Sequence, residues 1–558
     1  MNKSSFKSPR FSSIGIEARH FSEELVHGEN LNSIFLFSFL FCCDRIYGMS
    51  TKQFSRVFAA QPHHLSGVVV SVEVDISRGL HSFSVVGLPD KGVEEARDRV
   101  SSAIKNSGFP SPKSENHKIV VSLAPADLRK EGACFDVAIA VGYLLAVGEI
   151  VFDPVGKLFL GELGLDGSIR PITGTLPLVQ AAARNGIDQV FVPYANRQEA
   201  ALVDGVTVYP ITSLNELIQH LDPDDKREIV PQPATVPTSV GNADTVLCFS
   251  SIKGQEAGKR GLELAAAGGH NIALSGPPGT GKTMLARAFA GILPELSLDH
   301  MLEITGIHSI AGTLSGTLVI DPPFRAPHHT ASYVSIIGGG TTPKPGEVTL
   351  AHRGVLFMDE FPEFDKRVLE SLRQPLEDRS VHISRAKGSA QFPANFILVA
   401  AMNPCPCGNL GAKHKRCKCT PAELARYQRK LSGPIMDRID MHLIVEHIDY
   451  DTLSDRSPSG ETTAVIRERV ERARAKQRER FGNGKLNCHM NADDVGALVI
   501  SDSVRKLLNT SAESLHLSPR AYHRTLKLAR TIADVDESDV IAEEHILEAL
   551  QYRPKTSY

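Results

Sequence analysis

Alternation of apolar and polar residues marks several short runs in the first part of the chain. A period of two is typical of half-buried β-strands. The runs are GVVVSVEVDI at 67–76, HSFSVVGLP at 81–89 and KIVVSLAP at 118–125. Between the last two, apolar residues at helical spacing predict one helix face: Val93, Ala96, Val100, Ala103 and Ile104. Residues 49–221 are therefore predicted to form an α/β domain.

A different pattern follows. Residues 222–244 carry four prolines and many polar residues without apolar periodicity, which predicts a linker. Over 245–450, apolar runs expected to be strands alternate with helical patterns, the order of a parallel sheet wound with helices. The segments are NIALSG, KTMLARAFAGIL, GVLFMDE and NFILVAAMN. From 451 to 558 the pattern is helical only, so we expect a separate helical unit.

The most apolar run, SIFLFSFLFCC at 33–43, lies near the N-terminus. It is about half the ~20 residues that a membrane-spanning helix needs, and its preceding flank is acidic. We expect no membrane anchor. Residues 1–48 are interpreted as a disordered or over-extended N-terminus, with a signal-type segment as the alternative.

Composition limits the binding partners and the compartment. The formal net charge of −3 gives no general attraction to nucleic acid, so any DNA site must be a local basic patch. Nine cysteines in 558 residues, mostly scattered, are typical of a reducing compartment. We therefore expect a cytoplasmic protein.

A phosphate-binding loop is the most specific motif. The sequence GPPGTGKT matches the pattern G-x-x-x-x-G-K-[ST], with the required strand before it and helix after it. Its backbone N–H groups would hold phosphate oxygens, Lys282 would reach the β- and γ-phosphates, and Thr283 would ligate Mg²⁺. The residues expected to bind ATP here are Gly276, Pro277, Pro278, Gly279, Thr280, Gly281, Lys282 and Thr283.

Two carboxylates end the run GVLFMDE and provide the groups that hydrolysis needs. We expect Asp359 to bind Mg²⁺ and Glu360 to polarise the attacking water. Asn403 ends another apolar strand, where its amide could orient that water or sense the γ-phosphate. The alternative for Asn403 is an ordinary residue of a strand-ending turn.

Four cysteines lie within fifteen residues after Asn403, in the arrangement C-x-C, nine residues, C-x-C. Cys405, Cys407, Cys417 and Cys419 could present four thiolates to Zn²⁺, although C-x-C is tighter than the usual spacing. The intervening cations would offset the negative charge of a tetrathiolate centre. Free or redox-active thiols and an iron–sulfur cluster are the alternatives.

Two basic segments are candidates for contact with DNA. Residues 379–396 predict a strand, a turn and a return strand, with Arg385 and Lys387 near the tip. The helix predicted from Thr462 or Thr463 to Gly482 carries seven cations and three acids between Val465 and Arg480. A solvated, ion-paired face is the alternative for this helix.

Several long blocks give the chain a family resemblance. It resembles the magnesium-chelatase-like AAA+ ATPases, specifically the YifB/ComM subfamily, from about residue 50 to the C-terminus. The blocks are KGQEAGKRGLELAAAGGHNIALSGPPGTGKTMLA, RAPHHTASYVSIIGGG, PGEVTLAHRGVLFMDE, AAMNPCPCG and SGPIMDRID.

The resemblance implies a fold: a Lon-protease-like (ribosomal S5 domain 2-like) N-terminal domain, then an AAA+ P-loop NTPase core with a helical lid. The core would include a helix-2 insertion between the phosphate-loop helix and Asp359. Where Lon-type proteases carry their serine and general-base lysine, this chain has Cys134 and Pro177. Proline cannot accept a proton, so we expect this domain to be non-proteolytic.

The resemblance also implies a function. It makes Asn403 a sensor, Arg438 the finger inserted into a neighbouring subunit's site, and Arg520 the lid sensor. The protein would be a homo-hexameric, ATP-dependent DNA motor, a branch-migration helicase that acts on recombination intermediates during natural transformation. A metal-chelatase-type chaperone and a protein remodeller are the rival functions.

Overall fold

The computed structural model describes residues 53–114, 116–223, 227–236, 247–340, 343–385, 388–411, 415–431, 433–449, 460–482 and 484–554. The interpretation of residues 1–48 lies outside these ranges. So do much of the expected linker and Lys387. Among the described helices, none combines the length and apolar character that crossing a membrane requires.

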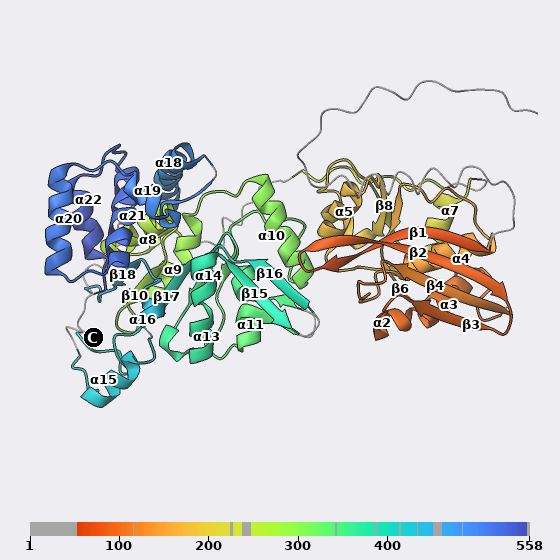
Figure 1. The fold of residues 1–558 in the computed structure, drawn as a ribbon, viewed down its shortest axis with the longest axis horizontal. Helices are drawn as coiled ribbons and strands as arrows, with labels where there is room; N and C mark the ends of the chain where they lie inside the picture. The colour runs from red at the N-terminus through yellow and green to blue at the C-terminus, as the bar shows by residue number, and fades with distance from the viewer. Residues whose placement is uncertain are drawn as a thin grey trace, which may run out of the picture. The chain divides into compact units, whose positions relative to one another are not determined.

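The first described sheet has seven strands in the order β3-β4-β2-β1-β5-β8-β9 (Figure 1). Its long strands β1 and β2 pair antiparallel, with Phe54 opposite Asp75 and His63 opposite Ser66. The three strands predicted from alternation are confirmed as β2, β3 and β4. The strands are β1 (Phe54–His63), β2 (Ser66–Arg78), β3 (Ser82–Val86), β4 (His117–Ala124), β5 (Lys157–Phe159), β8 (Gln189–Pro193) and β9 (Thr207–Ile211). A separate pair is β6 (Glu162–Leu163) and β7 (Ile169–Arg170).

Helices cover this sheet. The predicted helix face of Val93 to Ile104 is present but belongs to two helices, which are separated at Glu95. The helices are α2 (Lys91–Glu94), α3 (Ala96–Asn106), α4 (Asp136–Val147), α5 (Thr175–Arg184), α6 (Arg197–Ala200) and α7 (Leu214–Leu221), with a 3₁₀ turn, η2, at Tyr194–Asn196. Helix α4 is buried along almost its whole length and packs on β1 and β2.

The two residues compared with protease positions are both buried. Cys134 precedes α4, and burial raises the pKa of its thiol to about 12. A thiol with such a pKa stays protonated near neutral pH and is a poor nucleophile. Pro177 lies in the first turn of α5 and supplies no base. That this domain is non-proteolytic stays a prediction.

The second sheet has five strands in the order β11-β14-β17-β10-β18, and its pairs are parallel, as predicted. The strands are β10 (Ile272–Ser275), β11 (Phe324–Arg325), β14 (Val355–Met358), β17 (Ile397–Met402) and β18 (Met441–Ile444). Alternate residues of β14 enter different cores: Val355 and Phe357 join one, whereas Leu356 and Met358 join the other. The sheet is therefore buried on both faces, which explains its continuous apolar sequence runs.

Helices flank the second sheet. They are α8 (Glu256–Gly268), α9 (Lys282–Gly291), α10 (Leu298–Ala311), α11 (Tyr333–Ile337), α12 (Glu347–Leu350), α13 (Lys366–Ser371), α14 (Arg373–Asp378), α15 (Pro421–Gln428) and α16 (Gly433–Met436), with 3₁₀ turns η3 (Phe249–Ser251) and η4 (Phe361–Glu363). Two short antiparallel pairs accompany them: β12 (Gly338–Gly339) with β13 (Lys344–Pro345), and β15 (Ser380–Arg385) with β16 (Gly388–Pro393). The second pair confirms the predicted hairpin.

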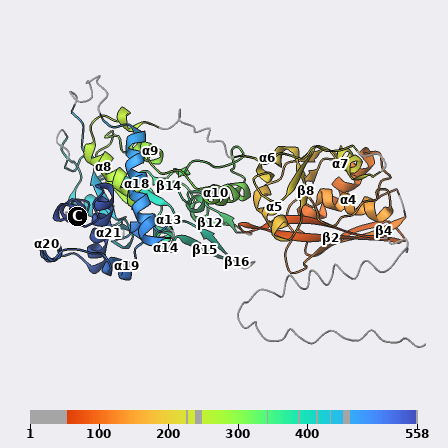
Figure 2. The same cartoon turned by 90° about the horizontal axis from the view of Figure 1, so that it is seen from above.

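The described C-terminal residues are helical, as predicted. They form α18 (Thr463–Phe481), η5 (Asn487–His489), α19 (Ala492–Gly496), α20 (Asp502–Ser514), α21 (Pro519–Val535) and α22 (Glu543–Gln551). Helix α18 begins after Thr462 and ends at Gly482, and it lies against α8 and α9 (Figure 2). These helices share one hydrophobic core with β10. This core contains Leu274 of β10 together with Leu526 and Ile532 of α21.

Candidate active site

The phosphate loop connects β10 to α9 at the carboxyl edge of the parallel sheet. Gly281 caps α9 with φ of +88°, a backbone conformation that favours glycine. Gly276 passes so close to the backbone of Val445 that a Cβ there would lie 2.2 Å from the Val445 carbonyl oxygen. The sequence motif thus folds into the expected strand, turn and helix, with the positive end of the α9 dipole at the loop.

Lys282 holds its amine inside this loop. Its Nζ donates to the carbonyl oxygens of Gly276 at 2.7 Å and Pro277 at 2.8 Å, and to Asn403 Oδ1 at 3.2 Å. Burial lowers the pKa of the amine, although the nearby Asp359 carboxylate opposes this effect. The structure therefore brings the predicted lysine and the predicted sensor together, from positions 121 residues apart.

The predicted magnesium ligands also converge. Thr283 Oγ1 donates to Asp359 Oδ2 at 3.0 Å, so a hydroxyl and a carboxylate face the same point beside the loop. Oxygen ligands of this kind suit Mg²⁺. The donor set therefore fits the metal expected with ATP.

Glu360 has a partner that sequence reasoning missed. Its backbone is left-handed, with φ of +49°, and its Oε2 lies 3.1 Å from Nδ1 of His329. His329 comes from the segment RAPHH, which follows β11, the sheet neighbour of β14. No spacing rule links these two positions, and only their places on adjacent strands bring them together.

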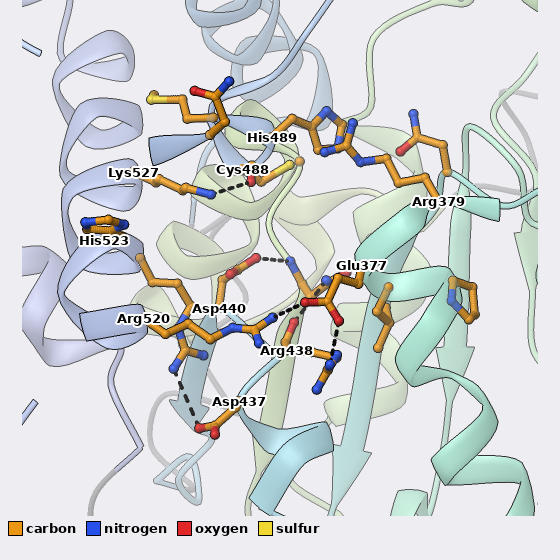
Figure 3. Close-up of a pocket in the computed structure, with 18 of the residues that line it drawn as sticks. Glu377, Arg379, Asp437, Arg438, Asp440, Cys488, His489, Arg520, His523 and Lys527 are labelled. Atoms are coloured by element: carbon orange, nitrogen blue, oxygen red, sulfur yellow. Dashed lines mark hydrogen bonds and ion pairs between the residues drawn. The ribbon is translucent and has the colours of Figure 1, made fainter. Parts of the chain in front are cut away.

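The two predicted arginines lie at the opposite edge of the sheet. Asn271 immediately precedes β10, and its Nδ2 donates to the backbone oxygen of Arg438 at 3.2 Å. Arg438 and Arg520 both pair with Glu377, at 2.5 Å and 3.5 Å (Figure 3). Glu377 accepts a hydrogen bond from Arg438, and this bond is the main cause of the lowered pKa of the Glu377 carboxyl group.

A cavity of about 450 Å³ lies at this edge, and its wall carries five cationic side chains together with the carboxylates of Glu377, Asp437 and Asp440 (Figure 3). Its cationic lining residues are Arg379, Arg438, Arg520, Arg524 and Lys527. None of them lines the phosphate loop of the same chain, since β10 separates the two edges. The structure thus places Arg520 beside Arg438 and not beside Lys282.

The four cysteines form one cluster. The Cys405 and Cys407 Sγ atoms are 3.4 Å apart, the Cys405 and Cys417 Sγ atoms 3.7 Å apart, and all four sulfurs lie within 4.8 Å of one another. Backbone N–H groups, that of Asn409 first, lower the pKa of the Cys407 thiol to about 6. The cluster could hold a metal ion, as its spacing predicted.

Most cationic side chains of the basic helix α18 form hydrogen bonds or ion pairs with other groups of the protein. Arg467 and Arg474 donate to backbone oxygens of Gly291 and Ala266. Three more arginines form ion pairs: Arg469 with Glu263 and Glu461, Arg472 with Glu468 and Glu537, and Arg480 with Asp534. The structure therefore favours the ion-paired interpretation of this helix over contact with DNA.

At the hairpin, the register pairs Arg385 with Gly388. Lys387 and the Arg385 side chain lie outside the part of the chain that the structure describes, so their assignment to DNA binding stays a prediction.

Comparison with protein families gives three matches along the chain. Residues 248–453 match the model for magnesium chelatase, subunit ChlI; residues 72–196 match a second model for subunit ChlI of Mg-chelatase; and residues 460–553 match the C-terminal region of that subunit. Together they cover much of the first sheet, without β1 and β9, and the second sheet and the helical unit.

Curated proteins match over most of the chain. The chain is 41% identical to competence protein ComM of Haemophilus influenzae and 42% identical to YifB of Escherichia coli, over 87% of this chain and 94% of each relative. A DNA replication licensing factor, Mcm6 of Drosophila melanogaster, is 25% identical over 55% of this chain and 37% of its own. Lon protease 2 of Bacillus subtilis is 24% identical over 28% of this chain and 30% of its own, so the likeness to Lon is partial.

Proposed function

This chain belongs to the ComM and YifB subfamily of magnesium-chelatase-like AAA+ ATPases, and from that premise we propose that it is a hexameric, ATP-driven DNA motor. Its substrate would be branched recombination intermediates, whose junction it would migrate along DNA in the cytoplasm during natural transformation. ATP is the fuel, and Mg²⁺ would neutralise the developing phosphate charge.

One observation supports the proposal: the residues to which we assign roles in hydrolysis lie at two opposite edges of one sheet. Lys282, Thr283 and Asp359 are at the carboxyl edge, whereas Arg438 and Arg520 are at the amino edge. An arginine that stabilises the γ-phosphate must touch it. A second copy of the chain would therefore supply these arginines, as in a closed ring of identical subunits.

The residues would divide the reaction between them. Lys282 would leave its carbonyl partners for the β- and γ-phosphates, while Thr283 and Asp359 would hold the metal ion. Glu360 would leave His329 to take a proton from the attacking water, and Asn403 would orient that water. The neighbour's Arg438 would exchange Glu377 for the γ-phosphate, and its Arg520 would lie beside it. Breaking these resting contacts would tie hydrolysis to movement of one subunit against the next.

The assignment to DNA rests on the relatives and on charge placement. The names of two relatives refer to competence and to DNA replication. Because the net charge is −3, binding needs concentrated cations, and six hairpins carrying Arg385 and Lys387 would form a basic collar. We further propose Zn²⁺ as the ion at the cysteine cluster.

The test is ATP-dependent conversion of a labelled mobile four-way junction into its duplex products. Protein carrying Glu360→Gln serves as the hydrolysis-deficient control. A hexameric, ATP-hydrolysing preparation that converts no junction geometry would overturn the proposal. Stimulation of hydrolysis by a porphyrin or by a protein, but not by DNA, would instead identify a chelatase-type chaperone or a remodeller.

A further inference from the structure

The cysteine cluster lies on the segment that leaves the nucleotide site. Asn403 immediately follows β17, and Cys405 follows two residues later. After the cluster, α15 brings Tyr427 back, and its hydroxyl donates to the Asn403 backbone oxygen at 2.9 Å. The segment thus starts and ends at the residue that contacts Lys282.

The distances between sulfurs suit a tetrahedral metal centre. Zinc–sulfur bonds of about 2.3 Å place the sulfurs of a tetrahedron roughly 3.8 Å apart. Three of the sulfur pairs here measure 3.4, 3.6 and 3.7 Å. A disulfide would need about 2.05 Å. The four cysteines of the cluster are therefore placed as metal ligands and not as disulfide partners.

Little else gives this segment its shape. Its described residues between Asn403 and α15 contain no helix or strand. Local hydrogen bonds run to the cysteines themselves: Gly408 N donates to the Cys405 oxygen, Leu410 N to Cys405 Sγ, and Asn409 Nδ2 to the Cys407 oxygen. An ion that gathers the four sulfurs would also fix these bonds.

Gly408 connects the cluster to the phosphate loop. A Cβ built on Gly408 would lie 2.6 Å from Cδ of Pro278, so the backbone of the cysteine segment packs directly on the loop. Pro278 precedes Gly279 in the turn that would receive the phosphates. The segment therefore contacts the nucleotide site at two points, through Pro278 and through Asn403.

We propose that a thiophilic divalent cation, bound by Cys405, Cys407, Cys417 and Cys419, controls nucleotide binding by holding the cysteine segment against Pro278 and Asn403. An ion that binds only the gathered sulfurs favours the conformation in which they are gathered. Loss of the ion releases Gly408 from Pro278 and loosens Asn403 beside Lys282. This inference rests on the ATP-binding part of the proposed function and not on DNA.

Removal and return of the metal is the first test. Wild-type protein is treated with a chelator, and bound metal, free thiols and affinity for a fluorescent ATP analogue are measured. We expect about one zinc per chain at the start, four more titratable thiols after its removal than before, and a loss of nucleotide affinity of roughly tenfold or more. Added Zn²⁺ should restore the affinity. Protein that holds no metal before chelation, or unchanged affinity after metal loss, would overturn the proposal.

The second test breaks the contact without touching a ligand. In Gly408→Ala the new methyl group must displace Pro278, whereas Gly411→Ala is a matched control. Gly411 lies in the same segment with the same φ of +76°, but a Cβ there meets nothing within 4 Å. We expect both variants to keep the metal and only Gly408→Ala to bind ATP more weakly, again by about tenfold.

Equal nucleotide affinity in Gly408→Ala and Gly411→Ala would contradict the proposed path through Pro278. Metal content and nucleotide binding are measured without DNA. Failure of this inference can therefore be told apart from failure of the motor, which the junction assay tests.

Discussion

The backbone oxygen of Arg438 accepts a hydrogen bond of 3.2 Å from the side chain of Asn271, the residue immediately before β10. The other end of β10 leads into the phosphate loop. One strand thus connects the groups that would bind ATP to the arginine that would act on a neighbour's ATP. In the proposed ring, we expect this strand to transmit movement at one subunit interface to the next.

Mixing of variants tests whether Arg438 acts in trans. Arg438→Ala and Glu360→Gln should each reduce hydrolysis by about 10²-fold or more, because each removes one group from every interface. In mixed rings, some interfaces join an intact Glu360 to an intact Arg438, so we expect partial recovery of ATPase rate.

The matched control mixes Arg438→Ala subunits with subunits that carry both substitutions. No interface in those rings has an intact Arg438, so no recovery is expected. Equal rates for the two mixtures, with mixed rings verified by mass, would count against a finger supplied by the neighbour.

Nucleotide binding and hydrolysis should separate between two residues of the same chain. Lys282→Ala removes the charge that faces the phosphates and should abolish measurable ATP binding. Glu360→Gln removes only the base, so binding should persist while the rate falls by about 10²–10⁴-fold. Titration with a fluorescent ATP analogue and a phosphate-release assay measure the two effects. Lys344→Ala, at an exposed lysine of β13, is the control, and wild-type affinity in Lys282→Ala would refute the phosphate-loop assignment.

The loss of folding stability at acidic pH should depend on His442, which lies on β18. Burial, aided by Arg524, lowers the pKa of this imidazole from 6.5 to about 4. In the unfolded chain His442 therefore binds a proton as the pH falls through 6.5, whereas in the folded chain it does so only near pH 4. The free energy of unfolding decreases as the pH falls from 6.5 toward 4. At pH 5.5 the loss is about 1 kcal/mol.

His442→Gln cannot take up this proton, so its melting temperature should fall less between pH 7.5 and 5.5 than that of the wild type. His81→Gln, at an exposed position, should behave as the wild type does. A decrease in His442→Gln as large as in the wild type would show that other groups cause the acid sensitivity.

The local motifs were predictable from the sequence because their chemistry depends on neighbouring residues. The phosphate loop and the ends of α18 depend on glycine and threonine at particular positions. The hairpin depends on alternation of apolar and polar residues within a short window. The division of the first helix at Glu95 was missed, because the apolar period continues across this residue.

Contacts between distant segments were not predictable in the same way. Glu377 joins Arg438 and Arg520, which come from segments 61 and 143 residues away. His329 meets Glu360 only because β11 and β14 are neighbours in the sheet. The contact of Gly408 with Pro278 depends on how the cysteine segment folds back, which its spacing does not specify.

The hairpin should couple hydrolysis to DNA. Replacing Arg385 and Lys387 by alanine removes two cations per subunit from the expected collar. DNA affinity should fall, and its dependence on salt should become shallower, because fewer counterions are released on binding. The ratio of ATP hydrolysis with DNA to hydrolysis without it should approach about one if phosphate contacts drive the stimulation. Fluorescence anisotropy at several salt concentrations and a phosphate-release assay measure these effects.

Arg472→Ala is a control for charge that removes one cation per subunit, where the hairpin variant removes two. This substitution also removes a cation from the surface. Arg472, however, is held in ion pairs with Glu468 and Glu537, and it lies on α18, the helix that the structure disfavours as a DNA contact. Its affinity and salt dependence should remain those of the wild type. If Arg472→Ala weakens DNA binding as much as the hairpin variant does, the effect is one of net charge. If neither variant changes it, the DNA-contacting cations lie elsewhere in the ring.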